Sequence, residues 1–372
     1  MSRGRVLVSM SGGVDSSVAA WLLLQDGYEC VGATMRLAAN EDDRPGERTC
    51  CSVDDVADAR EACWRLGIRH HVFDYTRQFD RDVIEPFVAS YEAGLTPNPC
   101  VACNRRLKFG ALLERALDLG CDWLATGHYA RVEANRGARR AETHPGVTYR
   151  LLKGVDASKD QSYFLHGLTQ SRLSHVLLPL GGMVKATQVR RIAEEAGLAV
   201  AHKKDSEGIC FVPGGDHLRF IEERTGRTPG DGTILDRQGN VLGAHHGALR
   251  YTIGQRKGLG VASTRPLYVC AVDTRANTVT LGDTADLMRR ELLAEGWSWI
   301  SGAAPCEPGG TVRATAKVRY HQPDQPCSLT PLADGHVRVI FDEPQRAIAP
   351  GQYAVAYLGD EVLGGGVITR AE

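Results

Sequence analysis

The sequence predicts an α/β protein with a doubly wound parallel sheet, followed by a small central mixed domain and a C-terminal all-β barrel. Three observations support this prediction. Apolar runs of strand type alternate with helical segments over roughly the first 200 residues, as in parallel βαβ units. A glycine-rich polar segment near residue 205 interrupts that pattern. From Glu291 onward, alternating hydrophobic residues separated by turn residues indicate a barrel or sandwich.

The N-terminal elements follow one another in an order that brings several loops to one edge of a sheet. We expect strands at residues 6–9, 30–34, 70–73 and 123–126, and helices at residues 16–25, 52–66 and 109–119. Ligands of such sheets lie beyond the carboxyl ends of the strands. The loop after the first strand, Met35 after the second and Gly127–His128 after the fourth should therefore face one site.

The rest of the chain is predicted from short strands and turns. Residues 233–243 suggest a hairpin that turns at residues 238–240. The segments TVRATAKVRY, HVRVIFD and QYAVAYLGDEVLGGGVI supply barrel strands, and the polar residues 135–146 resemble an exposed excursion. A chain of 372 residues is long for one domain. We place the domains at residues 1–207, 208–282 and 283–372.

Composition argues against several classes of protein. No apolar stretch approaches the length that spans a bilayer, so we expect a soluble cytoplasmic protein that does not act at a membrane. The formal net charge of -1 means that any nucleic-acid-binding surface would be local. The odd number of cysteines, 11 in all, argues against a secreted disulfide framework and suits a reducing compartment.

The stretch SGGVDSS, residues 11–17, follows the first predicted strand and opens the first predicted helix. Gly12 and Gly13 permit the close approach that a phosphate-binding loop needs, and a helix N-terminus favours anions. A GxxxxGK[ST] loop would supply a lysine, whereas this one has Asp15. A carboxylate beside phosphates needs a bridging cation, so we expect Mg²⁺ with ATP. The loop suits chemistry at the α-phosphate better than γ-phosphoryl transfer.

Three cysteines stand apart from the others. Cys100 and Cys103 form a C-x-x-C pair in TPNPCVACNRRLKFG, and Cys210 lies in DSEGICF. A helix that started at the pair would lower the pKa of a thiol there through its dipole. The residues alone leave three interpretations open: nucleophilic sulfur chemistry, an iron–sulfur cluster on all three thiols, and packing. Four other cysteines lie in apolar runs, which predict buried side chains: Cys30, Cys63, Cys121 and Cys270. Cys50 and Cys51 suggest no function.

Eight segments, in order along nearly the whole chain, resemble the bacterial tRNA-specific 2-thiouridylases. They are SGGVDSS, TPNPCVACN, ATGHYAR, KDQSYFL, DSEGICF, GQRKGLG, KVRYHQ and PGQYAVAY. SGGVDSS alone would indicate only the wider ATP-pyrophosphatase group, whereas the two cysteine segments are specific. The resemblance implies an adenine nucleotide α-hydrolase-like ATP-pyrophosphatase domain, a central tRNA-contacting domain and a C-terminal β-barrel.

The resemblance also implies a reaction. ATP would adenylate the C2 oxygen of the wobble uridine in tRNA, and sulfur from a persulfide on Cys210 would replace that oxygen. Cys103 would free the sulfur, ending in a Cys103–Cys210 disulfide that cellular reductants reopen. A sulfur-donor protein, either a cysteine desulfurase or a relay protein, would be a partner. The residues implied for ATP are Ser9, Met10, Ser11, Gly12, Gly13, Val14, Asp15, Ser16, Met35 and Gly127. Those implied for tRNA are Asn98, Pro99, Cys100, His128, Lys159, Asp160, Gln161, Arg319, Tyr320 and Gln352.

The chain departs from the family pattern at Cys100, where several members have an aspartate with an acid–base role. A thiol of lowered pKa could take that role, or the cysteine could complete a three-thiolate cluster. Cations mixed with aromatic residues at 250–257 and 313–321 suit phosphate contacts and base stacking, and the target base would have to leave the anticodon stack.

Three rival functions each explain one part of the sequence. Another pyrophosphate-releasing ligase would use the loop but needs no remote cysteines. A thiol–iron redox module needs no ATP loop, and a purely RNA-binding protein would leave both the loop and the cysteines unused.

Overall fold

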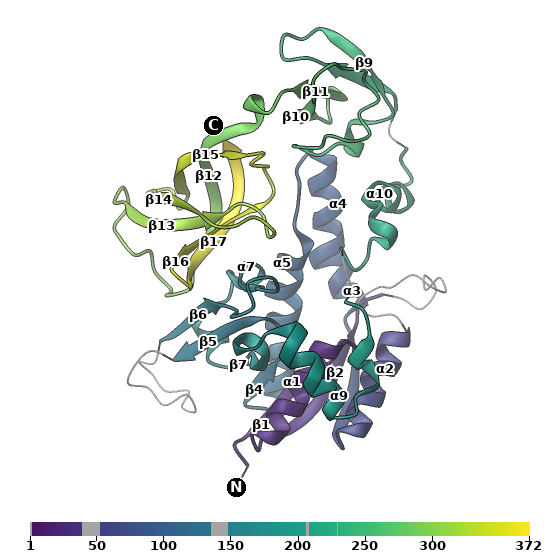
Figure 1. Cartoon of the computed structure of the whole chain (residues 1–372), viewed down its shortest axis with the longest axis vertical. Helices are drawn as coiled ribbons and strands as arrows, with labels where there is room; N and C mark the ends of the chain where they lie inside the picture. The colour runs from purple at the N-terminus through teal and green to yellow at the C-terminus, as the bar shows by residue number, and fades with distance from the viewer. Residues whose placement is uncertain (1, 39–52, 135–147, 206–207, 229) are drawn as a thin grey trace.

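The computed structural model describes residues 2–38, 53–134, 148–205, 208–228 and 230–372. Figure 1 shows an α/β part at the N-terminal end, a small central part and a C-terminal barrel. Cys50, Cys51 and the excursion expected at residues 135–146 lie outside the described residues. No helix within the described ranges is long and apolar enough to cross a membrane.

The N-terminal part contains a five-stranded parallel sheet in the order β3-β2-β1-β4-β7. Its strands are β1 (Arg5–Ser9), β2 (Glu29–Arg36), β3 (Arg69–Asp74), β4 (Trp123–Ala125) and β7 (Val176–Leu177). Leu7 and Leu124 belong to a core shared with the segments η3 (Asn104–Leu112) and α6 (Leu113–Asp118). Val6 and Val8 belong to a core shared with α1 (Val14–Gln25) and α2 (Val53–Arg65). Helices therefore cover both faces, which confirms the doubly wound sheet.

The third predicted helix begins earlier than the sequence suggests. It starts with α5 (Pro99–Cys103) and runs without a break through η3, a π-helical segment, and α6. Pro99 stands at the first helical position, where the missing N–H of proline has no intrahelical partner to lose. Pro99 thus marks the start of this helix.

Other elements of the N-terminal part connect this sheet to the rest of the chain. The helical segments are α3 (Thr76–Phe79), η2 (Asp80–Ile84), α4 (Glu85–Glu92), α7 (Ser162–Leu165), α8 (Gln170–Leu173), η4 (Pro179–Gly182), η5 (Lys185–Val189), α9 (Arg190–Glu195) and η6 (Ala199–His202). β5 (Ala130–Ala134) and β6 (Tyr149–Lys153) form an antiparallel hairpin. This hairpin is not part of the parallel sheet; β6 pairs with the last strand of the barrel sheet. This hairpin was not predicted from the sequence.

The central part begins with η7 (Pro213–Gly215) and α10 (His217–Thr225) and contains a four-stranded sheet in the order β10-β11-β8-β9. Its strands are β8 (Gly232–Leu235), β9 (Val241–His245), β10 (Tyr268–Asp273) and β11 (Thr278–Gly282), with η8 (Ala248–Arg250) between β9 and β10. The predicted hairpin is confirmed, because β8 and β9 pair antiparallel around residues 236–240.

The C-terminal part is the predicted barrel. After η9 (Ala285–Leu287) come β12 (Met288–Trp299), β13 (Val312–Lys317), β14 (Gln325–Pro331), β15 (Val337–Arg346), β16 (Tyr353–Leu358) and β17 (Glu361–Ala371). These strands follow the order β12-β15-β14-β13-β16-β17, and pairing of β12 with β17 closes the barrel. Its core residues alternate along the strands, as an inward-facing side requires.

Partly buried polar contacts hold the barrel against the N-terminal part. Lys153 of β6 pairs with Asp324 at 2.9 Å, and its Nζ lies 4.5 Å from the centre of the Tyr357 ring. The Tyr163 hydroxyl donates to the Tyr353 carbonyl at 3.0 Å. Such fully partnered groups fix one orientation between domains, since each would cost free energy if left unpaired.

His166 makes the stability of this interface depend on pH. It is fully buried beside Tyr353, its Nδ1 donates to the Tyr163 carbonyl at 2.7 Å, and burial lowers its pKa to about 4. An unfolded histidine titrates near 6.5, so acid favours the unfolded chain below that pH. We expect His166 to reduce the free energy of unfolding by about 2 kcal/mol at pH 5 relative to pH 8.

The measurement is urea unfolding at pH 5 and pH 8, compared with a His166→Gln variant. The variant should show a smaller loss of stability on acidification, even if it is less stable at pH 8. An equal loss in both proteins would contradict the assignment.

Candidate active site

The loop between β1 and α1 is held in a shape that only glycine permits at Gly12. Gly12 has φ +70°, and a Cβ there would lie 2.2 Å from the carbonyl oxygen of Asp55. The Ser11 N–H donates to Ser16 Oγ at 3.2 Å, and Ser17 Oγ donates to the Gly13 carbonyl at 3.0 Å. The loop thus leads into the N-terminus of α1, a geometry suited to phosphate.

The loop after β4 closes on the loop after β1. A Cβ at Gly127 would lie 2.7 Å from the backbone carbon of Asp15 and 2.8 Å from the Ser16 nitrogen. β1 and β4 are neighbours, and the strand order reverses between them, which is where ligands of doubly wound sheets bind. Met35 lies near the carboxyl end of β2, but its side chain is buried in the core.

Asp15 sits in a network of charges that comes from distant parts of the chain. Its carboxylate accepts from Tyr129 Oη at 2.7 Å and from Lys185 Nζ at 2.7 Å. Lys185 also pairs with Asp205 at 2.8 Å, and Lys159 pairs with Asp205 at 2.9 Å. The loop itself contains no lysine, but η5 places Lys185 beside it.

A second lysine supports the loop from behind. Lys203 Nζ donates to the Gly12 carbonyl at 2.9 Å and to Asp55 at 2.7 Å, and it also pairs with Asp58. Burial alone would lower the pKa of Lys203, but the two carboxylates outweigh it and raise the pKa. The ammonium group thus stays charged and fixes the position of Gly12.

We expect Lys203→Met to weaken ATP binding about tenfold, because the Gly12 carbonyl and two carboxylates lose their shared cation. Calorimetric titration with the Mg²⁺ complex of α,β-methylene-ATP measures this affinity without turnover. The matched control is Lys204→Met, which removes the neighbouring exposed lysine. Equal affinities in the two variants would contradict the supporting role of Lys203.

The C-x-x-C pair lies on α5. Asn98 precedes the helix, Cys100 is partly buried and Cys103 is buried at the helix end. Cys103 belongs to the central hydrophobic core, and Cys210 packs against that same core. The ring of Phe211 lies 5.1 Å from that of Phe87, which anchors the segment that contains Cys210.

The barrel contributes the wall opposite α5. The Thr96 N–H donates to the Pro350 carbonyl at 2.9 Å, which places the PGQY turn and Gln352 beside the TPNP segment. The ring of Tyr320 lies 4.3 Å from that of Phe164. Burial, then Asp160 and Cys100, raise the pKa of Tyr320 to about 12. The fold therefore brings together residues 98–100, Tyr320 and Gln352, which are far apart in sequence.

Comparison with known proteins agrees with this combination of parts. Family models described as the tRNA methyl transferase HUP domain, its PRC-barrel domain and the aminomethyltransferase beta-barrel domain match residues 4–214, 219–283 and 289–368. A tRNA-specific 2-thiouridylase MnmA from Geotalea uraniireducens is 48% identical over 99% of this chain and 96% of its own. The chain belongs to the MnmA family. A tRNA-specific 2-thiouridylase MnmA from Moorella thermoacetica is 49% identical over 97% of this chain and 98% of its own.

Several residues that the resemblance to MnmA assigns to tRNA are engaged inside the protein. Asp160 accepts from the Gly154 and Ser162 N–H groups at 3.0 and 3.1 Å, and Gln161 accepts from the Tyr129 N–H at 3.0 Å. Their side chains are bound in the fold and orient the loop before α7. This limits their direct contact with RNA.

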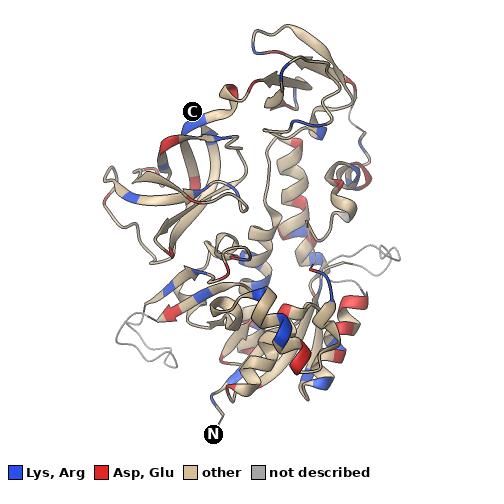
Figure 2. Cartoon of the chain, viewed as in Figure 1, with Lys and Arg blue, Asp and Glu red and all other residues tan. Residues whose placement is uncertain are grey.

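His128 is also buried, and Arg319 is partly buried. His128 hydrogen-bonds Thr126 at 2.7 Å, and burial, then Lys108, hold the pKa of His128 well below its usual range. Arg319 donates to the carbonyls of Ile253 and Ala347 at 3.1 and 2.8 Å, which ties the central part to the barrel. Lys159, by contrast, is partly exposed beside Asp205. Figure 2 shows basic and acidic residues interspersed in all three parts, so any RNA-binding surface is local.

The described part of the chain offers no ready metal centre. Within the described ranges, no three His, Cys, Asp or Glu side chains gather in a way that could hold a metal ion. Cys100, Cys103 and Cys210 therefore do not fit a cluster as they stand. A single carboxylate such as Asp15 fits Mg²⁺ that arrives with nucleotide phosphates, because this ion keeps most of its other ligands from water and phosphate.

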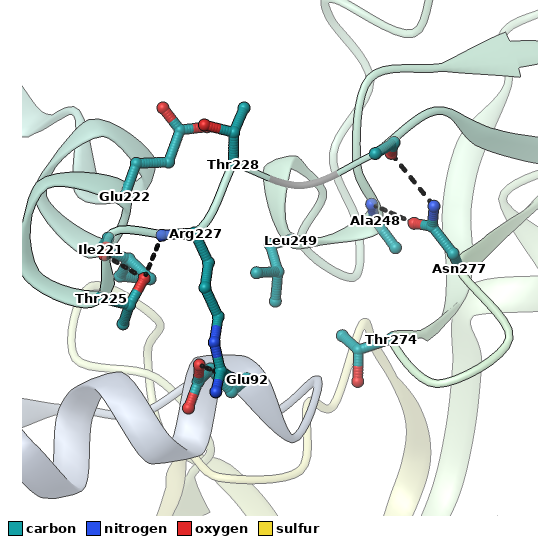
Figure 3. Close-up of a pocket in the computed structure, with 11 residues that line it drawn as sticks. Glu92, Ile221, Glu222, Thr225, Arg227, Thr228, Ala248, Leu249, Thr274 and Asn277 are labelled. Carbon is teal, nitrogen blue, oxygen red and sulfur yellow. Dashed lines mark hydrogen bonds and ion pairs between the residues drawn. The ribbon is translucent and has the colours of Figure 1, made fainter.

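A cavity of about 460 Å³ lies away from the predicted site (Figure 3). It is lined by Glu92 of α4, by residues of α10 and by the central part. Asn277 bridges its wall by accepting from the Ala248 N–H and donating to the Gly230 carbonyl. The cavity is thus a junction between the α4 end and the central part, and it includes none of the predicted site residues.

Proposed function

We propose that this chain is an ATP-dependent tRNA sulfurtransferase that converts the wobble uridine to 2-thiouridine. The observation that supports this best is the ion pair of Asp15 with Lys185, which in turn binds Asp205. It joins the nucleotide loop to the segment that contains Cys210. The relatives that match the chain over almost its whole length are named tRNA-specific 2-thiouridylases.

The first step is adenylation of the C2 oxygen of the uridine. The oxygen attacks the α-phosphorus of ATP, and pyrophosphate leaves. The Ser9–Ser16 loop would hold the phosphates, with Gly127 allowing the close approach of the two loops. Asp15 would hold Mg²⁺ that arrives with ATP, and the ion would supply positive charge to balance the departing pyrophosphate. The adenylated oxygen can then leave as AMP.

The second step transfers sulfur. The terminal sulfur of a Cys210 persulfide attacks C2 and expels AMP, which links C2 to Cys210 through two sulfurs. The Cys103 thiolate then attacks the Cys210 sulfur and breaks the sulfur–sulfur bond. The base keeps one reduced sulfur, and two thiols have been oxidised to one disulfide. A cellular thiol reductant must reopen that disulfide before the next turnover.

The tRNA would approach the wall formed by α5 and the barrel. Asn98, Pro99 and Cys100 would lie against the everted base, with Tyr320 and Gln352 opposite them. Lys159 is placed to contact RNA phosphate, whereas Asp160, Gln161, His128 and Arg319 would act by positioning. The central part and the barrel would contact the remainder of the tRNA.

The sulfur would come from a donor protein, and the enzyme would work in the cytoplasm, where its tRNA substrate is made. The experiment is a thiolation assay with unmodified tRNA, Mg–ATP and a persulfide-generating cysteine desulfurase. Nucleoside mass spectrometry should detect 2-thiouridine and one AMP for each modified base. Activity that required bound iron and labile sulfide in the protein would favour the cluster alternative and overturn the persulfide scheme.

A further inference from the structure

Both oxygens of the Asp15 carboxylate are held by groups from outside the nucleotide loop. One oxygen accepts from Tyr129 Oη at 2.7 Å, and the other accepts from Lys185 Nζ at 2.7 Å. Tyr129 is buried, and the side chain of Lys185 is only 7% exposed. The position of Asp15 beside the phosphates therefore depends on what fixes Tyr129 and Lys185.

The segment of residues 154–161, which we call the 154–161 loop, connects β6 to α7 and fixes both partners. The Gln161 N–H donates to the Tyr129 carbonyl at 2.8 Å, and Gln161 Oε1 accepts from the Tyr129 N–H at 3.0 Å. The Asp156 carboxylate accepts from the Lys185 N–H at 2.9 Å. A change in the shape of this loop would therefore reach the nucleotide loop by two routes at once.

Asp160 closes the 154–161 loop on itself. Its Oδ1 accepts from the N–H groups of Gly154 and Ser162, at 3.0 and 3.1 Å, and its Oδ2 accepts from Ser162 Oγ at 3.0 Å. Asp160 is buried, and a carboxylate removed from water costs free energy unless a cation lies beside it. The shape of the loop therefore depends on a counter-ion for Asp160.

The barrel supplies this counter-ion. Lys317 ends β13, its Nζ lies 3.5 Å from Asp160 Oδ2, and only 12% of the lysine side chain is exposed. The same Nζ lies 5.7 Å from the centre of the Tyr357 ring on β16, a distance at which a cation and an aromatic face attract each other. Lys317 is thus enclosed between the barrel and the N-terminal part, although residues 313–321 suggest RNA contacts in sequence.

We propose that Lys317 is a positioning residue for the adenylation step. It neutralises Asp160 and so fixes the 154–161 loop, and this loop holds the two partners of Asp15. The barrel, which the proposed function assigns to tRNA, is thereby also a support of the nucleotide site. This inference rests on the proposed function for the binding of ATP by the nucleotide loop.

The test is a double-mutant cycle on the ion pair. Affinity for the Mg²⁺ complex of α,β-methylene-ATP is measured by calorimetric titration without tRNA. Lys317→Met leaves the Asp160 carboxylate unpaired, and Asp160→Asn leaves the Lys317 ammonium group unpaired, so each should weaken binding about tenfold. The double variant contains neither charge, and its asparagine can still accept from the Gly154 and Ser162 N–H groups. It should bind within about threefold of the unmodified protein, and Lys317→Arg, which keeps the charge, within about twofold.

The matched control is Lys153→Met. Lys153 lies between the same two parts, 4.5 Å from the centre of the same Tyr357 ring, but its carboxylate partner at 2.9 Å is Asp324 of the barrel rather than Asp160. This variant should lose stability to urea, as Lys317→Met does, yet bind the analogue within about twofold of normal. In turnover, Lys317→Met should raise KM for ATP more than it lowers kcat, while KM for tRNA stays within about twofold.

Equal losses of affinity in Lys317→Met and Lys153→Met would show that Lys317 only stabilises the contact between the parts, and would overturn the inference. A double variant that binds no better than Lys317→Met, or normal affinity in both single variants, would overturn it too. If Lys317→Met does not fold, comparison of Asp160→Asn with Lys153→Met decides in the same way. Failure of the unmodified protein to bind the analogue would instead remove the nucleotide loop, and with it both the proposed function and this inference.

Discussion

Cys210→Ser is expected to abolish thiolation of tRNA, with a loss of at least about 1,000-fold in rate, while tRNA affinity stays within about twofold. A serine hydroxyl accepts no persulfide sulfur, so the first sulfur-carrying group is missing. Cys210 is partly exposed beside the core, so the fold should tolerate the change. The rate is measured as 2-thiouridine formed per enzyme, and affinity by filter binding of unmodified tRNA.

Cys103→Ser should have an equally severe effect on turnover for a different reason. The persulfide could still form on Cys210, but no thiolate would attack the Cys210 sulfur to release the base. Matched controls are Cys121→Ser, which changes another buried cysteine, and Cys270→Ser, which changes another partly exposed one. Full activity in either Cys103→Ser or Cys210→Ser would remove the persulfide scheme.

Asp15→Ala should reduce kcat/KM for ATP by about 100-fold or more, because the proposed Mg²⁺ would lose its carboxylate ligand beside the phosphates. The fold should survive, since Lys185 remains paired with Asp205 at 2.8 Å. The Tyr129 hydroxyl loses its acceptor. Release of pyrophosphate in the presence of tRNA measures the adenylation step directly.

Asp15→Asn separates the charge from the hydrogen bond. Asparagine can still accept from Tyr129 but binds Mg²⁺ poorly, so its activity should remain close to that of Asp15→Ala. Recovery of pyrophosphate release in Asp15→Asn would show that Asp15 acts on Tyr129 rather than on the metal. Unchanged release in both variants would show that the loop is assigned wrongly.

Much of the fold could be predicted because its signals are local. The strand of residues 6–9, the glycines of the loop and the helix that follows are adjacent in the chain, and the structure has β1 and α1 there. The β8–β9 hairpin follows from turn residues next to its strands. The same local signals misplaced the start of the helix at Pro99, because proline is compatible with both a turn and a first helical position.

The contacts that define the site are not local. Lys185 lies in no motif, and only the fold brings it to Asp15 across 170 positions of sequence. The β5–β6 hairpin gives no sign in sequence that it will pair with the barrel. Asp160 and Arg319 are polar residues in polar segments, so sequence favours exposure. The structure instead buries Asp160 and partly buries Arg319, and each links two parts of the chain.

The most direct test of the account is a single turnover without reductant. Protein that has been persulfidated on Cys210 is mixed with unmodified tRNA and Mg–ATP, quenched in acid and digested for mass spectrometry. The persulfide mechanism predicts one peptide disulfide between Cys103 and Cys210 for each 2-thiouridine formed, and none when ATP is omitted. Thiolated tRNA formed in equal amount while both thiols remain reduced would contradict it.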